Sequence, residues 1–325
     1  MPLILVVGGA GYIGSHMVKL LLGSGYQTIT LDNLSSGYRD AVLGGEFVHT
    51  DLADRPALDR LFAERKIDAV MHFASFIQVG ESVKLPAKYY ENNVTNTLNL
   101  LDAMVARGIK RFIFSSSAAV YGNPTTVPIP EDHAKNPINP YGRTKWMVEQ
   151  ILEDYDTAYG LKSVSLRYFN AAGADPEGQL GERHEPETHL IPLILRAASG
   201  RAPDIKVFGR DYDTPDGTCI RDYVHVADLC DAHRLALDHL LNDGSRAVYN
   251  LGNGNGFSVA EVITATERVT GRTIPVTDAP RRDGDPPRLV ANATQARATL
   301  GWRPQYDDLD AIIAHAWAWE CKHPG

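Results

Sequence analysis

The chain has 325 residues, of which 44% are hydrophobic and 22% are charged, proportions typical of folded globular proteins and unlike those of disordered ones. Its length exceeds what one small hydrophobic core organises, so we expect two lobes. With 32 basic and 40 acidic residues the formal net charge is −8, which together with the absence of a long basic run excludes a typical nucleic-acid-binding protein.

The cysteines and the hydropathy pattern bear on location. Cys219, Cys230 and Cys321 show no C-x-x-C pairing and cannot build a disulfide framework in a chain of this length. No window approaches the roughly 18 consecutive apolar residues that a membrane span needs, and the first residues lack the basic region of a signal peptide. We therefore expect a cytoplasmic protein without a membrane partner.

Short apolar runs alternate with helix-length amphipathic stretches through the first half of the chain. This alternation is typical of parallel strands joined by crossover helices. Because the runs are apolar throughout, they indicate strands buried on both faces of a doubly wound parallel sheet, the Rossmann type of α/β fold. The strands we expect are residues 3–7, 28–31, 47–49, 69–73, 111–115 and 164–168.

The first strand leads into a glycine-rich turn that carries Gly8, Gly11 and Gly14. In a dinucleotide-binding loop the first glycine permits the turn, the second admits a pyrophosphate, and the third lets the helix approach the strand. Asp32 follows at the end of the second strand, where a carboxylate can bind the adenosine ribose. No arginine follows Asp32 directly, which favours NAD over NADP, although Arg39 lies seven residues on.

Asp51 and Leu52 close the third strand at the same edge of the sheet. We expect both residues to lie against the adenine of the cofactor. The alternative is that Asp51 caps the helix that follows.

Ser117, Tyr141 and Lys145 are the candidate catalytic residues. Tyr141 and Lys145 are four residues apart on one predicted helix and share a face. A nearby ammonium, together with an oxidised nicotinamide, favours the phenolate form that could act as a base; the alternative is a surface pair. Ser117 follows the fifth strand and could hydrogen-bond a reacting hydroxyl, whereas Ser115 is better explained as a cap of local backbone groups.

The character of the chain changes after Asn170. A turn at residues 174–178 and a polar stretch at residues 182–188 precede helical patterns at 190–199, 226–241, 259–269 and 309–319, with a possible strand at 248–251. We expect residues 1–172 to form the Rossmann domain, with residues 222–252 returning to it. Residues 173–325 should form a second, smaller α/β substrate lobe.

Together these motifs resemble the extended short-chain dehydrogenase/reductase superfamily. The sequence around the motifs is similar more specifically to the UDP-glucose 4-epimerase family, and the similarity extends over nearly the whole chain. The segments that carry it are residues 9–16, 31–34, 79–82, 89–94, 167–170, 216–225, 249–252 and 300–302.

This resemblance implies an isomerase that holds NAD tightly and interconverts UDP-glucose and UDP-galactose. Sugar C4 is oxidised transiently, and the 4-keto sugar is then reduced on its opposite face. Tyr141 would take the proton of the C4 hydroxyl, and Lys145 would also hold the nicotinamide ribose. The resemblance further implies a homodimer.

The resemblance and the motifs together give two sets of expected contacts. The cofactor-binding residues are Gly8, Gly11, Tyr12, Ile13, Gly14, Asp32, Asn33, Asp51, Leu52, Phe73, Ala74, Asn92, Ser115, Tyr141, Lys145 and Tyr168. The substrate-binding residues are Ser117, Tyr141, Asn170, His189, Leu190, Phe208, Arg221, Arg282, Asp285 and Leu289.

Three positions depart from the family or leave its substrate open. Ile77 replaces a lysine that contacts the cofactor, and His189 replaces an asparagine near the substrate phosphates. Leu289 stands where a bulky tyrosine or a small cysteine or serine governs access of N-acetylated sugars. One alternative is therefore a 4-epimerase of UDP-N-acetylglucosamine, UDP-xylose or UDP-glucuronate. Another is a non-catalytic NAD-sensing protein, because the fold alone does not establish a function.

Two further classes of chemistry are disfavoured. The sequence has alanines at 118 and 119, where related dehydratases and decarboxylases carry the acidic residues that their reactions need. His225, His233 and His239 lack the acidic and thiol partners of a zinc site, so we expect no metal.

Overall fold

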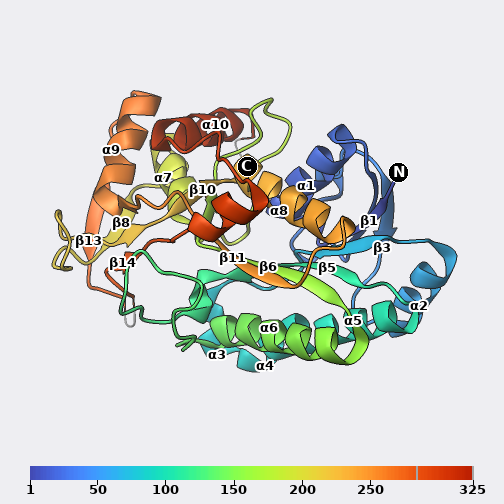
Figure 1. Ribbon diagram of the computed structural model, residues 1–325. Coiled ribbons are helices and arrows are strands. Elements are labelled where there is room, and N and C mark those ends of the chain that lie inside the picture. The colour runs from blue at the N-terminus through green and yellow to red at the C-terminus, as the bar shows by residue number, and fades with distance from the viewer. Residues whose placement is uncertain (283–284, 324–325) are drawn as a thin grey trace.

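The computed structural model describes residues 1–282 and 285–323, and a parallel sheet lies at its centre (Figure 1). Within the described chain the sheet has seven strands in the order β11-β6-β5-β4-β1-β2-β3. This confirms the predicted doubly wound α/β fold with a second lobe. The strands are β1 (Leu3–Val7), β2 (Gln27–Asp32), β3 (Glu46–His49), β4 (Ala69–His72), β5 (Arg111–Ser117), β6 (Lys162–Tyr168) and β11 (Ala247–Leu251).

The apolar strands are buried on both faces, as their composition requires. In β1 the side chains of Ile4 and Val6 belong to one core cluster, and those of Leu5 and Val7 belong to the other. This alternation follows from the two-residue period of a strand. The sheet therefore separates two hydrophobic cores, each of which must be covered by helices.

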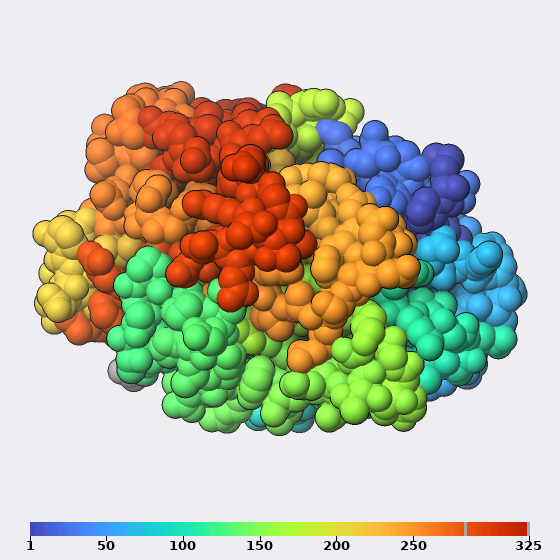
Figure 2. All heavy atoms as spheres, in the orientation of Figure 1, coloured from blue at the N-terminus to red at the C-terminus, as the bar shows by residue number. Residues whose placement is uncertain are grey.

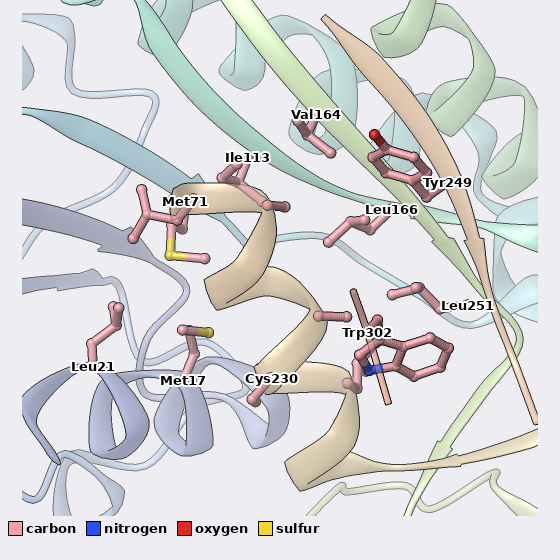
Figure 3. Packing of buried hydrophobic residues seen from close by; sticks show 14 of the residues in the cluster. Met17, Leu21, Met71, Ile113, Val164, Leu166, Cys230, Tyr249, Leu251 and Trp302 are labelled. Carbon is pink, nitrogen blue, oxygen red and sulfur yellow. The ribbon is translucent and has the colours of Figure 1, made fainter. Parts of the chain in front are cut away.

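Helices cover each face of the sheet. The helices α1 (Tyr12–Gly23) and α8 (Val226–Leu241) pack against one face. Figure 3 shows Met17, Leu21 and Cys230 in this layer, with Trp302 at its edge. The opposite face is covered by α2 (Arg55–Glu64), α5 (Asn96–Ala106) and α6 (Pro140–Tyr159), beside which lie α3 (Val79–Lys84), α4 (Pro86–Tyr90) and the π-helical turn η2 (Glu91–Thr95).

The second lobe has its own hydrophobic core, which includes Ile194, Val262 and Ile312. Its helices are α7 (Leu190–Ala198), α9 (Val259–Thr270) and α10 (Leu309–Lys322), close to the predicted ranges. Its strands form three small sheets: β7 (Asn170–Ala172) with β10 (Tyr223–His225), β8 (Ile205–Phe208) with β13 (Val276–Ala279), and β9 (Ile220–Arg221) with β12 (Phe257–Ser258) and β14 (Arg288–Leu289).

The chain passes repeatedly between the two lobes. It leaves the sheet after β6, returns for α8 and β11, and leaves again. A later segment then crosses back, and Figure 2 shows it in red-orange beside α8 and beside the green segment around residue 130. Trp302 donates a hydrogen bond to the Asp228 carbonyl of α8 (2.9 Å), and Ala291 pairs with Ile129. These contacts fasten the C-terminal part of the chain to the sheet domain.

Short helical turns complete the described elements: η1 (Arg39–Ala41), η3 (Ala118–Val120) and η4 (Ala296–Leu300). None of the helices in the described ranges combines the length and the apolar character that crossing a bilayer would need.

Candidate active site

The glycine-rich turn lies between β1 and the first turn of α1. Gly8 has a φ of +79°, and a Cβ there would lie 2.5 Å from the Ala74 nitrogen. A Cβ at Gly14 would lie 2.1 Å from the Gly8 carbonyl oxygen. A Cβ at Gly11 would meet the protein no closer than 3.4 Å. Gly8 and Gly14 are thus required by the fold itself, whereas Gly11, which begins α1 without a side-chain cap, leaves backbone N–H groups open to an anionic ligand.

Asp32 is fixed at the end of β2, beside the glycine-rich turn. Its carboxylate accepts hydrogen bonds from the backbone nitrogens of Ala10 (2.9 Å) and Leu34 (2.8 Å). Arg39, which could have favoured a 2′-phosphate, instead stacks its guanidinium 4.4 Å from the centre of the Phe47 ring. Both observations agree with a ribose site suited to NAD.

Asp51 lies next to Asn33, whose amide donates a hydrogen bond to its carboxylate (2.6 Å). The cap of α2 is Asp54, which accepts a hydrogen bond from the Ala57 nitrogen. The structure thus removes the helix-cap alternative for Asp51. Leu52 is buried in the adjoining core.

Ser117, Tyr141 and Lys145 come together between β5 and α6. Asn139 caps α6 by accepting a hydrogen bond from the Gly142 nitrogen (2.8 Å), and this cap sets where the helix begins. The Lys145 ammonium lies 5.8 Å from the centre of the Tyr141 ring. The Ser117 hydroxyl accepts a hydrogen bond from the Ala119 nitrogen (3.1 Å) and is close enough to the phenol to lower the pKa of Tyr141.

Burial governs the protonation of these groups. It raises the pKa of Tyr141 above its ordinary value, and the hydrogen bond with Ser117 offsets part of the rise. Burial also lowers the pKa of Lys145 to about 7, against the attraction of Glu149. Desolvation thus opposes charge on both groups, so the phenolate expected from the sequence would depend on the charge of the nicotinamide as well as on Lys145.

Two polar residues that were not predicted from the sequence, Ser75 and Asn93, hold Lys145 and its helix. The Lys145 ammonium donates to the Ser75 hydroxyl and to the Ser115 carbonyl oxygen, both at 2.8 Å. Buried Asn93 bonds to both the nitrogen and the oxygen of Phe76 and to the Thr144 hydroxyl. Ser75 follows β4 at the carboxyl edge of the sheet, where ligands bind in this type of fold. This position was the sequence feature that could have marked Ser75 as a site residue.

A buried ion pair lies behind the catalytic residues. Glu149 follows Lys145 by one helical turn and pairs with Arg167 at 2.5 Å, with both side chains almost fully buried. Glu149 also accepts a hydrogen bond from Ser116, which lies between Ser115 and Ser117 in β5 (2.5 Å). The pair joins β5, β6 and α6, and so fixes the base of the site.

Several predicted substrate residues meet in the second lobe. The pairing of β9 with β14 sets Arg221 opposite Leu289, and the Arg221 guanidinium forms an ion pair with Asp285. Nearby in the chain, the Arg282 guanidinium lies 3.9 Å from the centre of the Phe208 ring. Leu289 packs against the small cluster that includes Ala118, the neighbour of Ser117, so it reaches the catalytic side of the lobe.

The remaining predicted residues are distributed around these groups. The Tyr12 hydroxyl donates to the Gly173 carbonyl (2.7 Å), and the Asn170 amide donates to the Asp222 carbonyl (2.9 Å). Tyr168 is paired in register with Ser117, and the pKa of its phenol is raised by burial. Phe73 and Ile13 pack at the core under α8, Ala74 packs at the opposite core, Ser115 contacts His233, and Asn92 bonds to Asn93.

His189 and Leu190 begin α7, away from the Arg221 group in the chain. The Nδ1 atom of His189 lies 2.7 Å from a Glu182 oxygen and 3.2 Å from a Glu187 oxygen. These two carboxylates, which the sequence analysis did not single out, are almost fully buried. Ile77, the departure from the family pattern, is partly exposed and makes no contact comparable to that of Ser75 with Lys145.

Comparison with known proteins gives a consistent result. Residues 4–252 match the model of the NAD dependent epimerase/dehydratase family. The chain is 55% identical to a UDP-glucose 4-epimerase of Rhizobium meliloti over 98% of its own length and 97% of that protein.

Solved structures are similar over the same extent. The crystal structure of UDP-glucose 4-epimerase from Brucella ovis in complex with NAD has a TM-score of 0.96 and 52% identity, and the match covers 98% of each chain. The UDP-Glc/GlcNAc 4-epimerase from Campylobacter jejuni has a TM-score of 0.88 and 44% identity, and the match covers 99% of this chain and 100% of that one.

Proposed function

We propose that Tyr141, Ser117 and Lys145 carry out the reaction of this chain, which belongs to the NAD dependent epimerase/dehydratase family and interconverts UDP-glucose and UDP-galactose with NAD as cofactor. The observation that carries the proposed roles is the convergence of the three side chains between β5 and α6, on the sheet whose first strand ends in the glycine-rich turn.

The described residues fit a dinucleotide. Gly11 leaves the space and the N–H groups for a pyrophosphate, Asp32 offers a fixed carboxylate to the ribose, and Asp51 and Leu52 would border the adenine. When bound, NAD supplies the acceptor and donor of the C4 hydride and the positive charge of its ring. Lys145 would hold the nicotinamide ribose, and the partly exposed Ile77 would add no polar contact.

Tyr141 would move the proton. Its phenol oxygen takes the proton of the sugar C4 hydroxyl and later returns a proton to the same oxygen of the sugar. Ser117 donates to or accepts from the phenol and the reacting hydroxyl, and this hydrogen bond offsets part of the penalty of burying a phenolate. Lys145 stabilises the same negative charge when it is protonated.

The smaller lobe would anchor UDP. Arg221 and Arg282 offer two guanidiniums to the diphosphate, and Phe208 offers an aromatic face to the uracil. Asn170 and His189 would add polar contacts. An anchored nucleotide with few fixed contacts to the sugar lets the 4-keto sugar present either face to the same reacting groups, which the reaction requires. Residues 1–172 and 222–252 would thus serve the cofactor, and the rest of 173–325 the UDP-sugar.

A 4-epimerase of wider range is the second candidate. Leu289 favours it to a limited extent, because a branched aliphatic side chain packed against the cluster that includes Ala118 leaves more room than a tyrosine but cannot hydrogen-bond an acetamido group. UDP-galactose should therefore be the main substrate, with weaker use of UDP-N-acetylgalactosamine.

We also propose that two copies of the chain pair through α3 and α6. These neighbouring helices carry the exposed apolar side chains of Val79, Val83 and Met147, and Leu85 follows α3 directly; a partner copy would cover them. Light scattering should give twice the mass of 35.6 kDa, and Val83→Glu should give the monomer. The three unpaired cysteines suit the cytoplasm.

Spectroscopy with substrate tests the whole assignment. Adding UDP-galactose to the purified protein should build reduced cofactor transiently, visible by absorbance and fluorescence, and a coupled assay should detect UDP-glucose. Tyr141→Phe should retain bound NAD and lose both signals. An unchanged spectrum together with no product from any UDP-sugar would indicate an NAD-sensing protein instead.

A further inference from the structure

Four ligand-type side chains converge in the irregular segment that precedes α7. Glu182, His184, Glu187 and His189 each offer a nitrogen or oxygen, and these atoms all lie within 4.8 Å of one another. They come from eight consecutive residues with the pattern Glu-x-His-x-x-Glu-x-His. The prediction of no metal rested on His225, His233 and His239, none of which belongs to this cluster.

The separations within this cluster match a coordination shell. The Nδ1 atoms of His184 and His189 lie 3.0 and 2.7 Å from Glu182 Oε1, and 3.9 and 3.2 Å from Glu187 oxygens. Ligand atoms around a tetrahedral zinc ion with bonds of roughly 2.0–2.2 Å lie about 3.3 Å apart. The four distances bracket this value.

The orientation of His189 favours a shared centre over pairwise hydrogen bonds. Its Nδ1 atom is buried and has a carboxylate oxygen at 2.7 Å, yet it makes no hydrogen bond of acceptable geometry with any described residue. An imidazolium would normally direct that N–H at one oxygen. A ring nitrogen that approaches two oxygens without pointing at either is the arrangement expected of ligands around one ion.

The charge of the cluster also calls for a cation. The side chains of Glu182 and Glu187 are only 6% and 1% exposed, and two adjacent buried carboxylates are costly without compensation. The nearest arginines are engaged elsewhere: Arg183 pairs with Asp40 at 2.6 Å, and Arg196 donates to the His184 carbonyl oxygen. No lysine or arginine of the described chain forms an ion pair with either carboxylate, so the compensating charge comes either from protons on His184 and His189, which contact both carboxylates, or from a bound cation.

Surrounding contacts position the proposed ligands. One Glu187 oxygen accepts hydrogen bonds from the backbone nitrogens of Thr188 and His189, both at 2.8 Å. Trp319 of α10 donates to the Glu182 carbonyl (3.3 Å), and the His184 ring packs edge-on against Tyr12 of α1. Such outer contacts are typical of metal sites, where they orient the ligands.

We propose that Glu182, His184, Glu187 and His189 bind one divalent transition-metal ion, for which zinc is the best fit. Two imidazoles and two carboxylates in a closed, four-ligand arrangement suit a structural zinc ion, and they suit calcium or magnesium poorly. The ion would fasten the 182–189 segment between α1, α7 and α10. It would engage Nδ1 of His189 and leave Nε2 as the ring nitrogen available to another ligand.

The site can be tested on the whole, tag-free protein independently of its enzymatic activity. Mass spectrometry of the metal content after purification without chelators should find about one zinc ion per chain. Chelator treatment should lower the thermal unfolding temperature, and added zinc should restore it. Added Co²⁺ should give the visible absorption bands of a tetrahedral site.

Variants then locate the ion. His184→Ala and Glu182→Gln should each weaken Co²⁺ binding by at least the roughly 10–100-fold that loss of a second-shell partner costs. His239→Ala is the matched control, because His239 lies near the end of α8 and donates to the Ser245 carbonyl (2.9 Å), and it should leave binding unchanged.

The proposal would be overturned by wild-type protein that purifies without metal and develops no Co²⁺ bands on titration. Protons on the two histidines would then neutralise the carboxylates. Equal metal binding by wild type and His184→Ala would also refute it. If a variant does not fold, the wild-type titration and its reversal by chelator still decide, and neither depends on turnover or on bound UDP-sugar.

Discussion

The proposed cofactor half of the site lies at the carboxyl ends of parallel strands, whereas the proposed substrate half lies on loops, at the start of α7 and on strands of two to four residues in the smaller lobe. In the first half, Asp32, Ser117 and Tyr141 are fixed by long strands or by a capped helix. In the second, Arg221 and Leu289 are neighbours because β9 pairs with β14 over only two residues. Rigid positioning suits a reaction that needs fixed geometry. Short strands suit a pocket in which the 4-keto sugar must rotate to present its other face.

Tyr141→Phe, in the first half of the site, should have the largest effect on turnover. It removes the phenol oxygen and leaves the ring that lines the pocket, so turnover should fall roughly 10²–10⁴-fold, the usual contribution of a general base. Extraction of the nucleotide should show NAD still bound and should find no phosphorylated form in wild type. Turnover close to wild type would mean that another group moves the proton.

Leu289 tests how the second half discriminates between sugars. Leu289→Ser should raise the ratio of kcat/KM for UDP-N-acetylgalactosamine to that for UDP-galactose, and Leu289→Tyr should lower it. Changes of this size in a pocket discriminate by about ten- to two-hundredfold. Equal ratios in all three proteins would show that Leu289 does not border the sugar.

Arg221→Lys should separate binding from chemistry in the same half. Lysine keeps the charge but loses the fork that grips phosphate oxygens, so KM should rise roughly tenfold while kcat stays nearly constant. Arg210→Lys is the matched control, because Arg210 pairs with Asp278 on the exposed surface and should change neither constant. A fall in kcat alone would assign Arg221 to the reacting centre.

Lys145→Met should show that burying this ammonium lowers the free energy of unfolding of the cofactor half. Burial lowers the pKa of Lys145 to about 7, below the value near 10.4 of the unfolded chain. Between these values the unfolded state binds more protons, so the stability of ligand-free wild type should gain up to about 1.4 kcal/mol per pH unit as pH rises. Denaturant unfolding from pH 7 to 9 should show this gain in wild type and in the exposed-site control Lys66→Met. If Lys145→Met retains the same slope, the lysine is not its source.

The two halves also differ in what the sequence can predict. The strands, the glycine-rich turn and the 141–145 pair were predictable because parallel strands end at one edge and helical residues four apart share a face. Ser75 was not predicted, since a serine after β4 resembles any loop serine until Lys145 is seen to donate to it. Glu149 could have been found, because it follows Lys145 by one helical turn.

In the smaller lobe the sequence predicts helices but not contacts. The ion pair of Arg221 with Asp285 joins residues 64 positions apart, through strands too short for a periodic pattern. The 182–189 segment is irregular in the structure, as predicted, yet its Glu and His spacing was a visible signal that its lack of periodicity obscured. In that segment the residue types and their spacing, rather than a periodic hydrophobic pattern, indicate a possible site.

The place of β11 at the edge of the sheet has a consequence for biosynthesis. A ribosome completes β6 about eighty residues before β11, the strand that covers its open edge. During that interval the nascent chain presents an unpaired edge, which invites association with other chains. A fragment ending at residue 172 should therefore aggregate, whereas one that extends through residue 252 contains every strand of the sheet. The sheet that carries the N-terminal motifs is thus complete only after residues that are translated much later have been added.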